Sequence, residues 1–356
     1  MDLRQQLHLL QQATCPEEVF GEEETAVKQR YRHLAAQTHP DAHPHDQAAA
    51  DEAFKLLQTW YAEAQRKIAQ GCYGQPLRIK VTSANYVYEG SKRPLIGDLC
   101  HLYPSHAASQ LVLLKMVQHS RNNDLAQAEA RALYQLDQAL RGEPLRAHFP
   151  TLVESFLLRD SGGISRQTNV LCHESDTVAL ADIIATYPNG IHPADMAWMF
   201  NRLLAALAVT HSQGLVHGAV LPPHLLLRPA DHNGVLLDWC YSVEIGRPIK
   251  AISPPYRAWY PPELLAKQPA TPASDLFLAA RCMVAALGGR VTGQENGIVW
   301  GKTAVPRPIT ALLQSCLIPA PHQRPNNGWE LFEAFHDILG QLYGQPQFRP
   351  FHMPTR

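Results

Sequence analysis

The stretch QTHPDAHPHD, residues 37–46, places three histidines and two aspartates close together. Imidazole and carboxylate groups are good ligands for zinc, copper and nickel, so a metal site is the first chemistry to consider. His39, His43 and His45 could supply nitrogen ligands, but Pro40 and Pro44 interrupt the segment. Because proline breaks a helix, no single helix face can present the three rings together. The elements on either side of the stretch suggest a different role.

Two amphipathic helices are predicted, one before and one after this stretch. Residues 22–37 begin with acidic side chains, which favours a helix N-terminus, and their apolar residues recur at helical spacing. The other face of this helix is basic and carries Lys28, Arg30, Arg32 and His33. Residues 48–68 predict a second long helix with Phe54, Leu57 and Tyr61 facing inward. The proline-containing loop joins the two, so the sequence predicts a helical hairpin.

This pattern resembles a J-domain, the co-chaperone module of DnaK-type heat-shock chaperones, over residues 1–70. The resemblance rests on VKQRYRHLAAQTHPD followed by a helix with the spacing F-x-x-L-x-x-x-Y. It implies that His39, Pro40 and Asp41 form the family's His-Pro-Asp tripeptide, which docks on the chaperone and stimulates its ATP hydrolysis. A cationic helix face that meets an acidic groove would steer this docking. The basic positions that match the family are Lys28, Arg30 and Arg32.

The opening histidine cluster then has one functional member, His39, and two bystanders. A His-Pro-Asp sequence is also a common turn, because Asp and Pro favour turns, so the two flanking helices carry the resemblance. The preceding segment, QQATCPEEVFGEEET, departs from the family because it lacks the Tyr-Tyr-x-x-Leu-Gly-Val sequence of the first helix.

A second domain is predicted over residues 81–342, after a linker at 71–80 that contains glycine and proline. Strand-like segments come first and helices later, which indicates an α+β architecture. Seven segments occur in the order found in protein kinases, so the domain resembles the bilobal protein-kinase fold. They are LVLLKM, AQAEARALYQL, HSQGLVHGAVLPPHLLL, VLLDWC, WYPPELL, SDLFLAARCMVAALGG and HQRP. The predicted fold class is an all-α J-domain hairpin followed by an α+β bilobal kinase-like fold.

The kinase resemblance implies roles for individual residues in these segments. Lys115 would contact nucleotide phosphates, Glu129 would form an ion pair with it, and Asp238 would bind magnesium if ATP binds. Backbone groups of residues 172–175 would line the adenine edge. The residues with implied structural roles are Glu263, its buried partner Arg324, and Asp275 at the start of a helix.

The catalytic loop and the phosphate-binding loop depart from the family. Ala219 replaces the catalytic aspartate, Leu221 replaces the lysine, and His224 replaces the metal-binding asparagine. Alanine cannot accept the substrate's proton, and loss of a general base typically costs about 10²–10⁴-fold in rate. Gly97 is the one glycine kept from the G-x-G-x-x-G pattern, which adds side chains where backbone should approach phosphate. Cys240 replaces the glycine of the Asp-Phe-Gly segment.

The sequence therefore predicts a pseudokinase fused to a J-domain. The surviving Lys115, Glu129 and Asp238 would hold ATP with magnesium, or would remain as a buried ion-pair network. The predicted function is a co-chaperone that recruits a DnaK-type chaperone, with the kinase-like domain as a nucleotide-binding, client or adaptor module. The alternatives are an atypical protein kinase or other ATP-dependent phosphotransferase that uses its J-domain for delivery, and a pure scaffold.

Composition excludes several other classes. A net charge of -1 over 356 residues gives no indication of a nucleic-acid binder. Seven scattered cysteines without a C-x-x-C pair indicate reduced thiols, as in the cytosol, and no apolar run is long enough to span a bilayer. We therefore expect a cytoplasmic protein without membrane contact. Residues 343–356 form a tail rich in proline and aromatic residues, whose role the sequence leaves open.

Overall fold

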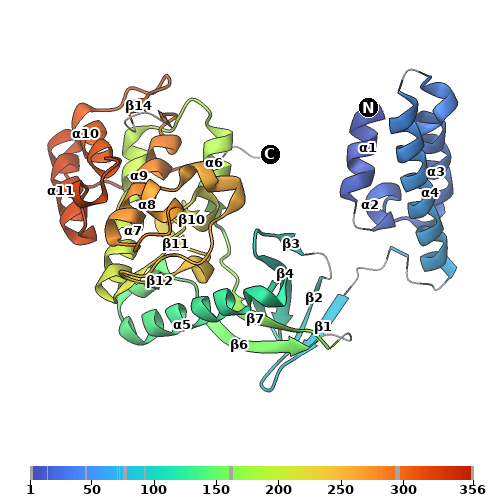
Figure 1. Cartoon of the computed structure of the whole chain (residues 1–356), viewed down its shortest axis with the longest axis horizontal. Helices are drawn as coiled ribbons and strands as arrows, with labels where there is room; N and C mark the ends of the chain where they lie inside the picture. The colour runs from blue at the N-terminus through green and yellow to red at the C-terminus, as the bar shows by residue number, and fades with distance from the viewer. Residues whose placement is uncertain are drawn as a thin grey trace. The chain divides into compact units, whose positions relative to one another are not determined.

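The chain folds as two compact units, Met1–Arg78 and Ile79–Arg356 (Figure 1). The structure, a computed structural model, describes residues 3–13, 15–44, 46–69, 71, 73–74, 78–91, 94–159, 163–292 and 297–353. His45 of the histidine cluster lies outside the described residues. Across the part of the chain that is described, helices are too short or too polar to cross a membrane.

The described part of the first unit is mainly helical. Its helices are α1 (Leu3–Gln12), α2 (Pro16–Phe20), α3 (Glu24–Thr38) and α4 (Gln47–Ala69), with the 3₁₀ turn η1 (Pro40–Ala42) before α4. The apolar faces of these helices meet in one small core in which Phe20, Val27 and Leu57 are fully buried. Tyr31 of α3 stacks on Tyr61 of α4, with 3.9 Å between ring centroids. The helical spacing of apolar residues thus brings α3 and α4 together through those faces.

A buried ion pair adds a polar tie between α2 and α4. The Lys67 ammonium lies 2.7 and 2.8 Å from the two carboxylate oxygens of Glu17, and both residues are buried. Breaking one partner of such a pair leaves an uncompensated buried charge, so the pair fixes how these helices meet.

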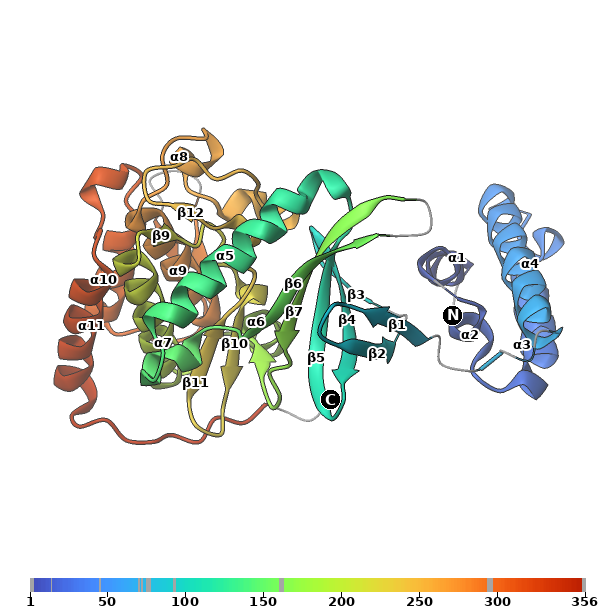
Figure 2. The ribbon, with the colours of Figure 1, turned by 90° about the horizontal axis from the view of Figure 1, so that it is seen from below.

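The second unit begins with a smaller lobe built on a seven-stranded sheet. The strands are β1 (Arg78–Thr82), β2 (Val87–Ser91), β3 (Leu95–Ile96), β4 (Cys100–Ala107), β5 (Gln110–Val117), β6 (Leu152–Arg159) and β7 (Ser165–Cys172). They are ordered β1-β2-β4-β5-β7-β6, with β3 paired to β4. The helix α5 (Asn123–Ala139) packs against β6 and β7 (Figure 2). Short 3₁₀ segments flank this helix, η2 (Ser120–Asn122) and η3 (Pro144–His148).

The larger lobe is mainly helical. Its α-helices are α6 (Leu180–Thr186), α7 (Pro193–Ser212), α8 (Pro262–Leu265), α9 (Pro272–Ala286), α10 (Arg307–Cys316) and α11 (Gly328–Tyr343). Its short strands are β8 (Val178–Ala179), β9 (Leu215–Val216), β10 (Leu225–Arg228), β11 (Asn233–Leu236), β12 (Val243–Glu244), β13 (Arg290–Val291) and β14 (Ile298–Val299). Its 3₁₀ segments are η4 (Pro222–His224), η5 (Trp239–Tyr241), η6 (Pro254–Trp259) and η7 (Pro321–Gln323). The long strands of the second unit thus lie in the smaller lobe, which comes first in the chain, and most of its α-helices lie in the larger lobe, in agreement with the α+β prediction.

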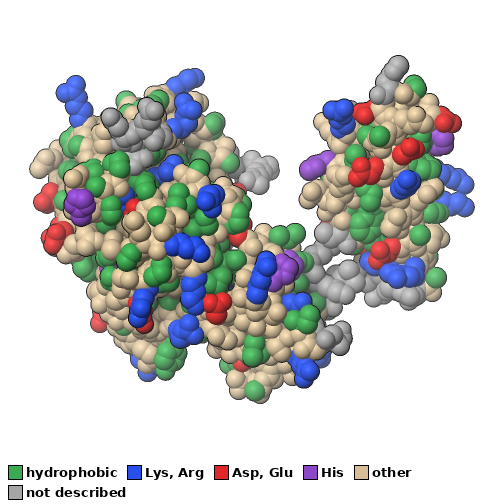
Figure 3. Space-filling view, viewed as in Figure 1, with side chains coloured by type: hydrophobic (Ala, Val, Ile, Leu, Met, Phe, Trp, Pro, Cys, Tyr) green, Lys and Arg blue, Asp and Glu red, His purple; other side chains and the backbone are tan. Residues whose placement is uncertain are grey.

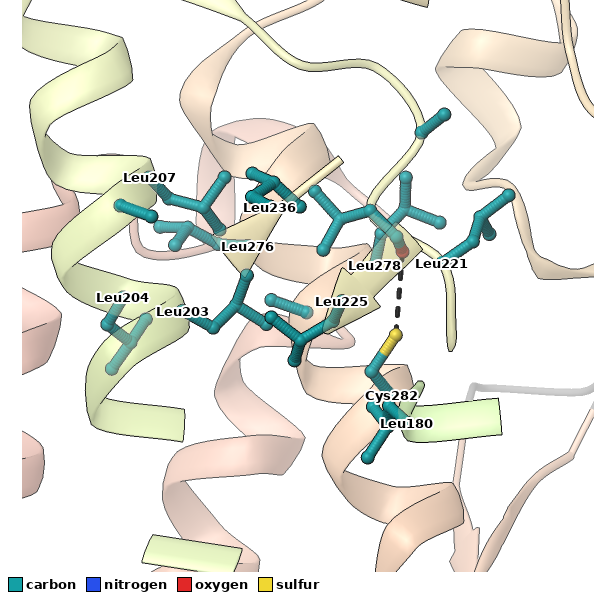
Figure 4. Close-up of a cluster of buried hydrophobic side chains, with 14 of the residues drawn as sticks. Leu180, Leu203, Leu204, Leu207, Leu221, Leu225, Leu236, Leu276, Leu278 and Cys282 are labelled. Atoms are coloured by element: carbon teal, nitrogen blue, oxygen red, sulfur yellow. Dashed lines mark hydrogen bonds between the residues drawn. The ribbon is translucent and has the colours of Figure 1, made fainter. Parts of the chain in front are cut away.

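A leucine-rich core lies beneath the loop that joins β9 to β10 (Figure 4). Leucines of α6, α7 and α9 meet leucines of β10 and β11 there, and Leu221 of the loop is fully buried among them. The Cys282 thiol of α9 donates a hydrogen bond to the Val220 carbonyl. The loop backbone is therefore held by the core of the larger lobe.

The tail after α11 packs back on the larger lobe (Figure 2). The His232 ring lies between Trp198 and Phe348, with 4.3 Å between ring centroids on each side. Arg349 forms an ion pair of 2.6 Å with Asp195, and Phe351 is buried. The described tail thus adds to the fold of this lobe. On the face shown in Figure 3, basic and acidic side chains are interspersed over both units.

Candidate functional site

Three charged residues meet between the two lobes of the second unit. Lys115 comes from the middle of β5 and is paired across the sheet with Leu102 and Asn169. Its ammonium lies 2.6 Å from Glu129 Oε1 of α5 and 2.5 Å from Asp238 Oδ1, which follows β11. Asp238 has a left-handed backbone, with φ of 64°, and this conformation turns the chain sharply after the strand. The sequence predicted these three residues as one group, and the structure brings them together.

The Glu129 carboxylate is fully buried and accepts hydrogen bonds from two further groups besides Lys115. Asn169 of β7 donates a hydrogen bond of 2.8 Å to Oε2, and the Trp239 backbone N–H donates one of 3.1 Å to Oε1. Asn169 is itself fully buried. Sequence reasoning missed it, because β7 reads SRQTNVLC and an asparagine in such a largely polar segment does not indicate a buried hydrogen-bonding role.

The pair interactions dominate the electrostatics of this group. Burial by itself would lower the pKa of Lys115, but attraction to Asp238 and Glu129 raises that pKa well above its ordinary value. Burial would raise the pKa of Asp238, but the charge of Lys115 and its hydrogen bond to the carboxylate hold that pKa well below its ordinary value. Both groups are therefore charged at neutral pH.

His224 is the third partner of the Asp238 carboxylate. Its Nδ1 lies 2.8 Å from the Ala219 carbonyl, and its Nε2 lies 3.2 Å from Asp238 Oδ2. The Leu237 N–H donates to the His224 carbonyl at 2.7 Å, which fixes the backbone of η4 beside the end of β11. The position implied for a metal-binding asparagine thus presents an imidazole to Asp238, the aspartate for which the kinase resemblance implies metal binding.

The position implied for the catalytic base offers no proton acceptor. Ala219 and Leu221 are both fully buried. The neighbouring His217 is also buried, its Nε2–H donates to the Leu237 carbonyl at 2.8 Å, and burial lowers its pKa to about 4. A neutral, hydrogen-bonded ring in the core does not reach a substrate hydroxyl, so His217 does not replace the base.

A cavity of about 430 Å³ opens between the lobes beside this group. Lys115, His224 and Asp238 line one end, and Cys172, His173 and Glu174 line another part of the wall. Most of the remaining wall is apolar, including Pro104, Leu113, Leu171, Leu226 and Leu237. This combination of an apolar wall with a few convergent charged groups is typical of a small-molecule site.

The loop that carries Gly97 closes part of this cavity. Gly97 donates its N–H to the Cys100 carbonyl at 3.0 Å, and its own carbonyl accepts from the Gln118 side chain at 2.5 Å. The next residue, Asp98, accepts a short hydrogen bond from the Ser253 hydroxyl, and Ser253 also lines the cavity. The predicted phosphate-binding glycine therefore lies at the cavity, in a hairpin tied to the segment before α8.

The predicted structural residues form a second buried network. Arg324 donates to both carboxylate oxygens of Glu263, at 2.6 and 3.2 Å. Asp275 accepts hydrogen bonds from the backbone N–H groups of His217 and Gly218, at 2.8 and 2.9 Å. Gly218 has φ of +76° and a Cβ there would lie 2.8 Å from the Tyr241 carbonyl, so this position in the loop requires glycine.

In the first unit, His39, Pro40 and Asp41 lie at the turn between α3 and α4. The Asp41 N–H donates to His39 Nδ1 at 3.2 Å, and the His39 ring meets Phe54 edge to face at 5.3 Å between centroids. The side chains of His39 and Asp41 are 49% and 92% exposed, so both are accessible to a partner. His43 instead lies 2.7 Å from the Gln37 carbonyl, which gives this bystander a structural bond.

The three predicted basic residues of α3 lie on two sides of the helix. Lys28 and Arg32 are exposed and separated by four residues, which places them on one face. Arg30 lies about 200° around the helix from each of them. Its guanidinium donates to the Phe20 carbonyl at the end of α2, at 2.9 Å. Lys28 and Arg32 thus form the continuous basic strip, while Arg30 also ties α3 to α2.

Comparison with known proteins gives a fold and leaves the family open. No family model matches the chain, and no curated protein sequence matches it. Among solved structures, the crystal structure of the BubR1 kinase domain is similar over 74% of this chain and 83% of that chain, with a TM-score of 0.55. The two sequences are 14% identical, so the similarity concerns the fold. The second unit therefore has a protein-kinase-like fold.

Proposed function

We propose that this protein is a J-domain co-chaperone whose kinase-like domain is a pseudokinase, acting as a nucleotide-binding, client or adaptor module. The observation that carries the proposal is the contrast between the two units. His39 and Asp41 of the first unit are exposed and accessible to a partner. Ala219 and Leu221 of the second unit, at the positions of the kinase aspartate and lysine, are fully buried in the core.

The exposed tripeptide supports recruitment of a DnaK-type chaperone. Pro40 starts the turn η1, and the hydrogen bond from the Asp41 backbone N–H to His39 Nδ1 holds the His39 ring against this turn. The basic strip of Lys28 and Arg32 would steer this surface onto an acidic groove of the chaperone. The chaperone then hydrolyses the ATP, and this protein stimulates that reaction without catalysing one of its own.

The cavity between the lobes supports binding of an adenine nucleotide. Lys115 is held beside Glu129 and Asp238 in the arrangement that positions phosphates in kinases. Cys172 at the end of β7 and Glu174 shortly after it line the wall, where backbone groups would meet an adenine. Phosphoryl transfer is disfavoured, because Ala219 and Leu221 provide neither base nor cation. Labelled ATP should therefore leave no label on this protein or on a partner.

The experiment is the ATPase rate of a DnaK-type chaperone with the full-length protein added. The wild type should stimulate the rate, and His39→Gln should abolish the stimulation. His43→Gln is the matched control, because it makes the same change four residues away at a residue bonded within its own turn. Equal stimulation by the wild type and the His39 variant would contradict the proposal.

A further inference from the structure

The hydrogen bonds of His224 fix which of its ring nitrogens can bind a cation. A backbone carbonyl only accepts, so the 2.8 Å contact between Nδ1 and the Ala219 carbonyl requires the hydrogen on Nδ1. Nε2 is therefore the ring nitrogen that faces Asp238, and it lies 3.2 Å from Asp238 Oδ2. An imidazole nitrogen and a carboxylate oxygen at this separation can both bind one cation.

We propose that the cavity binds its nucleotide phosphate together with a divalent transition-metal ion, held by His224 Nε2 and Asp238 Oδ2, in place of magnesium. The proposal rests on the proposed nucleotide binding for the ion's remaining ligands, because phosphate oxygens would complete the coordination. Magnesium prefers oxygen ligands, whereas first-row transition ions accept imidazole nitrogen. The histidine at the asparagine position therefore changes which ion the site favours.

The distance between the two ligand atoms fits one ion. Ligand atoms that lie about 2.1 Å from an ion, at right angles to each other, are about 3.0 Å apart. The observed separation of Nε2 and Oδ2 is 3.2 Å. Lys115 occupies the other carboxylate oxygen, Oδ1, and so leaves Oδ2 for the ion. Both ligand residues line the cavity, so the ion would face the space where phosphate is expected.

The surroundings hold the imidazole as metal-binding histidines are usually held. Such rings typically donate their second N–H to a carbonyl or carboxylate, which fixes the tautomer and the ring orientation. Here the Ala219 carbonyl has this role, and the ring also stacks on Tyr241, with 6.0 Å between centroids. Ala219 has no side chain that could act as a base, but its backbone carbonyl accepts the hydrogen bond that orients the His224 ring.

A neighbouring group of possible ligands does not compete for the ion. Glu129, Asp238 and Cys240 also have ligand atoms close to one another. The Glu129 carboxylate, however, already accepts from Lys115, Asn169 and the Trp239 N–H. Cys240 is buried, and neither it nor Glu129 is among the residues that line the cavity. The pair of His224 and Asp238 is the better site.

The test compares Mn²⁺ with Mg²⁺ on the full-length protein, by isothermal titration of ADP in the presence of each ion. ADP should bind at least about tenfold more tightly with Mn²⁺, in line with the effect of changing the environment of a metal site. Pulsed electron paramagnetic resonance on the Mn²⁺–ADP complex should show coupling to a nitrogen nucleus of the protein. His224→Asn should remove that coupling and the preference for Mn²⁺. His322→Asn, at an exposed histidine of the larger lobe, should change neither.

The outcomes separate the two proposals. If ADP binds equally well with both ions and no nitrogen coupling appears, the metal proposal is overturned and nucleotide binding stands. If Mn²⁺ binds with nitrogen coupling but ADP does not bind with either ion, nucleotide binding fails and the metal ligands stand. If the coupling persists in His224→Asn, another nitrogen holds the ion and the assignment to His224 is wrong.

Discussion

Restoring the kinase lysine at residue 221 should destabilise the second unit, because that position now belongs to the core. Leu221 is fully buried, with 0% of its surface exposed. Its side chain packs among leucines of α9 and β10 (Figure 4). Leu221→Lys loses the burial of a leucine side chain, about 1.5–3 kcal/mol. It also leaves an unpaired charge in the core, which costs about 3–5 kcal/mol when a buried partner is missing.

The expected loss is therefore about 4 kcal/mol or more, which for a unit of this size lowers the melting temperature by roughly 8–16 °C. Tryptophan fluorescence is a suitable assay, because Trp60 lies in the first unit and the other five tryptophans lie in the second. Leu221→Met is the matched control, since a volume-conserving change usually costs less than about 1.5 kcal/mol. A melting temperature of Leu221→Lys close to that of Leu221→Met would refute the assignment of this position to the core.

Three further predictions concern stability. Arg324→Ala should cost about 3–5 kcal/mol in the free energy of unfolding, because it leaves the buried Glu263 carboxylate without its partner; denaturant unfolding measures this loss, and a loss below about 1 kcal/mol would contradict it. The pKa of His217 is about 4 in the folded protein and about 6.5 when unfolded, so the unfolded state binds the proton first as the pH falls, and stability should decrease between these values by roughly 3 kcal/mol. Unfolding measured from pH 7 to pH 4 should show this slope reduced in His217→Gln, and an unchanged slope would refute the assignment. Phe351→Ala should release the tail, which limited proteolysis after Tyr343 would detect as faster cleavage, whereas equal cleavage of the variant and the wild type would argue against a docked tail.

The kinase-like fold could be predicted from sequence because its landmarks are local and ordered along the chain. Lys115 lies in an apolar strand, Glu129 in an amphipathic helix, and Asp238 directly after another apolar strand. The similarity in fold to a kinase domain confirms the α+β bilobal prediction. The J-domain prediction, the chaperone partner and the nucleotide stay proposals, which the experiments above address.

The rest of the site depends on contacts between residues far apart in the chain, which periodicity does not reveal. Asn169 reaches Glu129 across a strand and a helix, and His224 reaches Asp238 through a turn of the backbone. The helical pattern also did not separate Arg30 from Lys28 and Arg32, although the residue spacing contains that information. Docking of the tail depends on contacts of Phe348 and Phe351 with aromatic rings of the larger lobe that are far away in the sequence, so the sequence left it open.

We propose above all that this protein recruits a DnaK-type chaperone through His39, Pro40 and Asp41. The most direct measurement is the binding of the chaperone, in its ATP-bound state, to the immobilised full-length protein. Asp41→Asn removes a 92% exposed charge and keeps the size of the side chain, so the fold should be unaffected. Binding by the wild type that is lost in Asp41→Asn and retained in His43→Gln is the predicted result. Equal binding by all three proteins, or binding by none of them, would contradict the account.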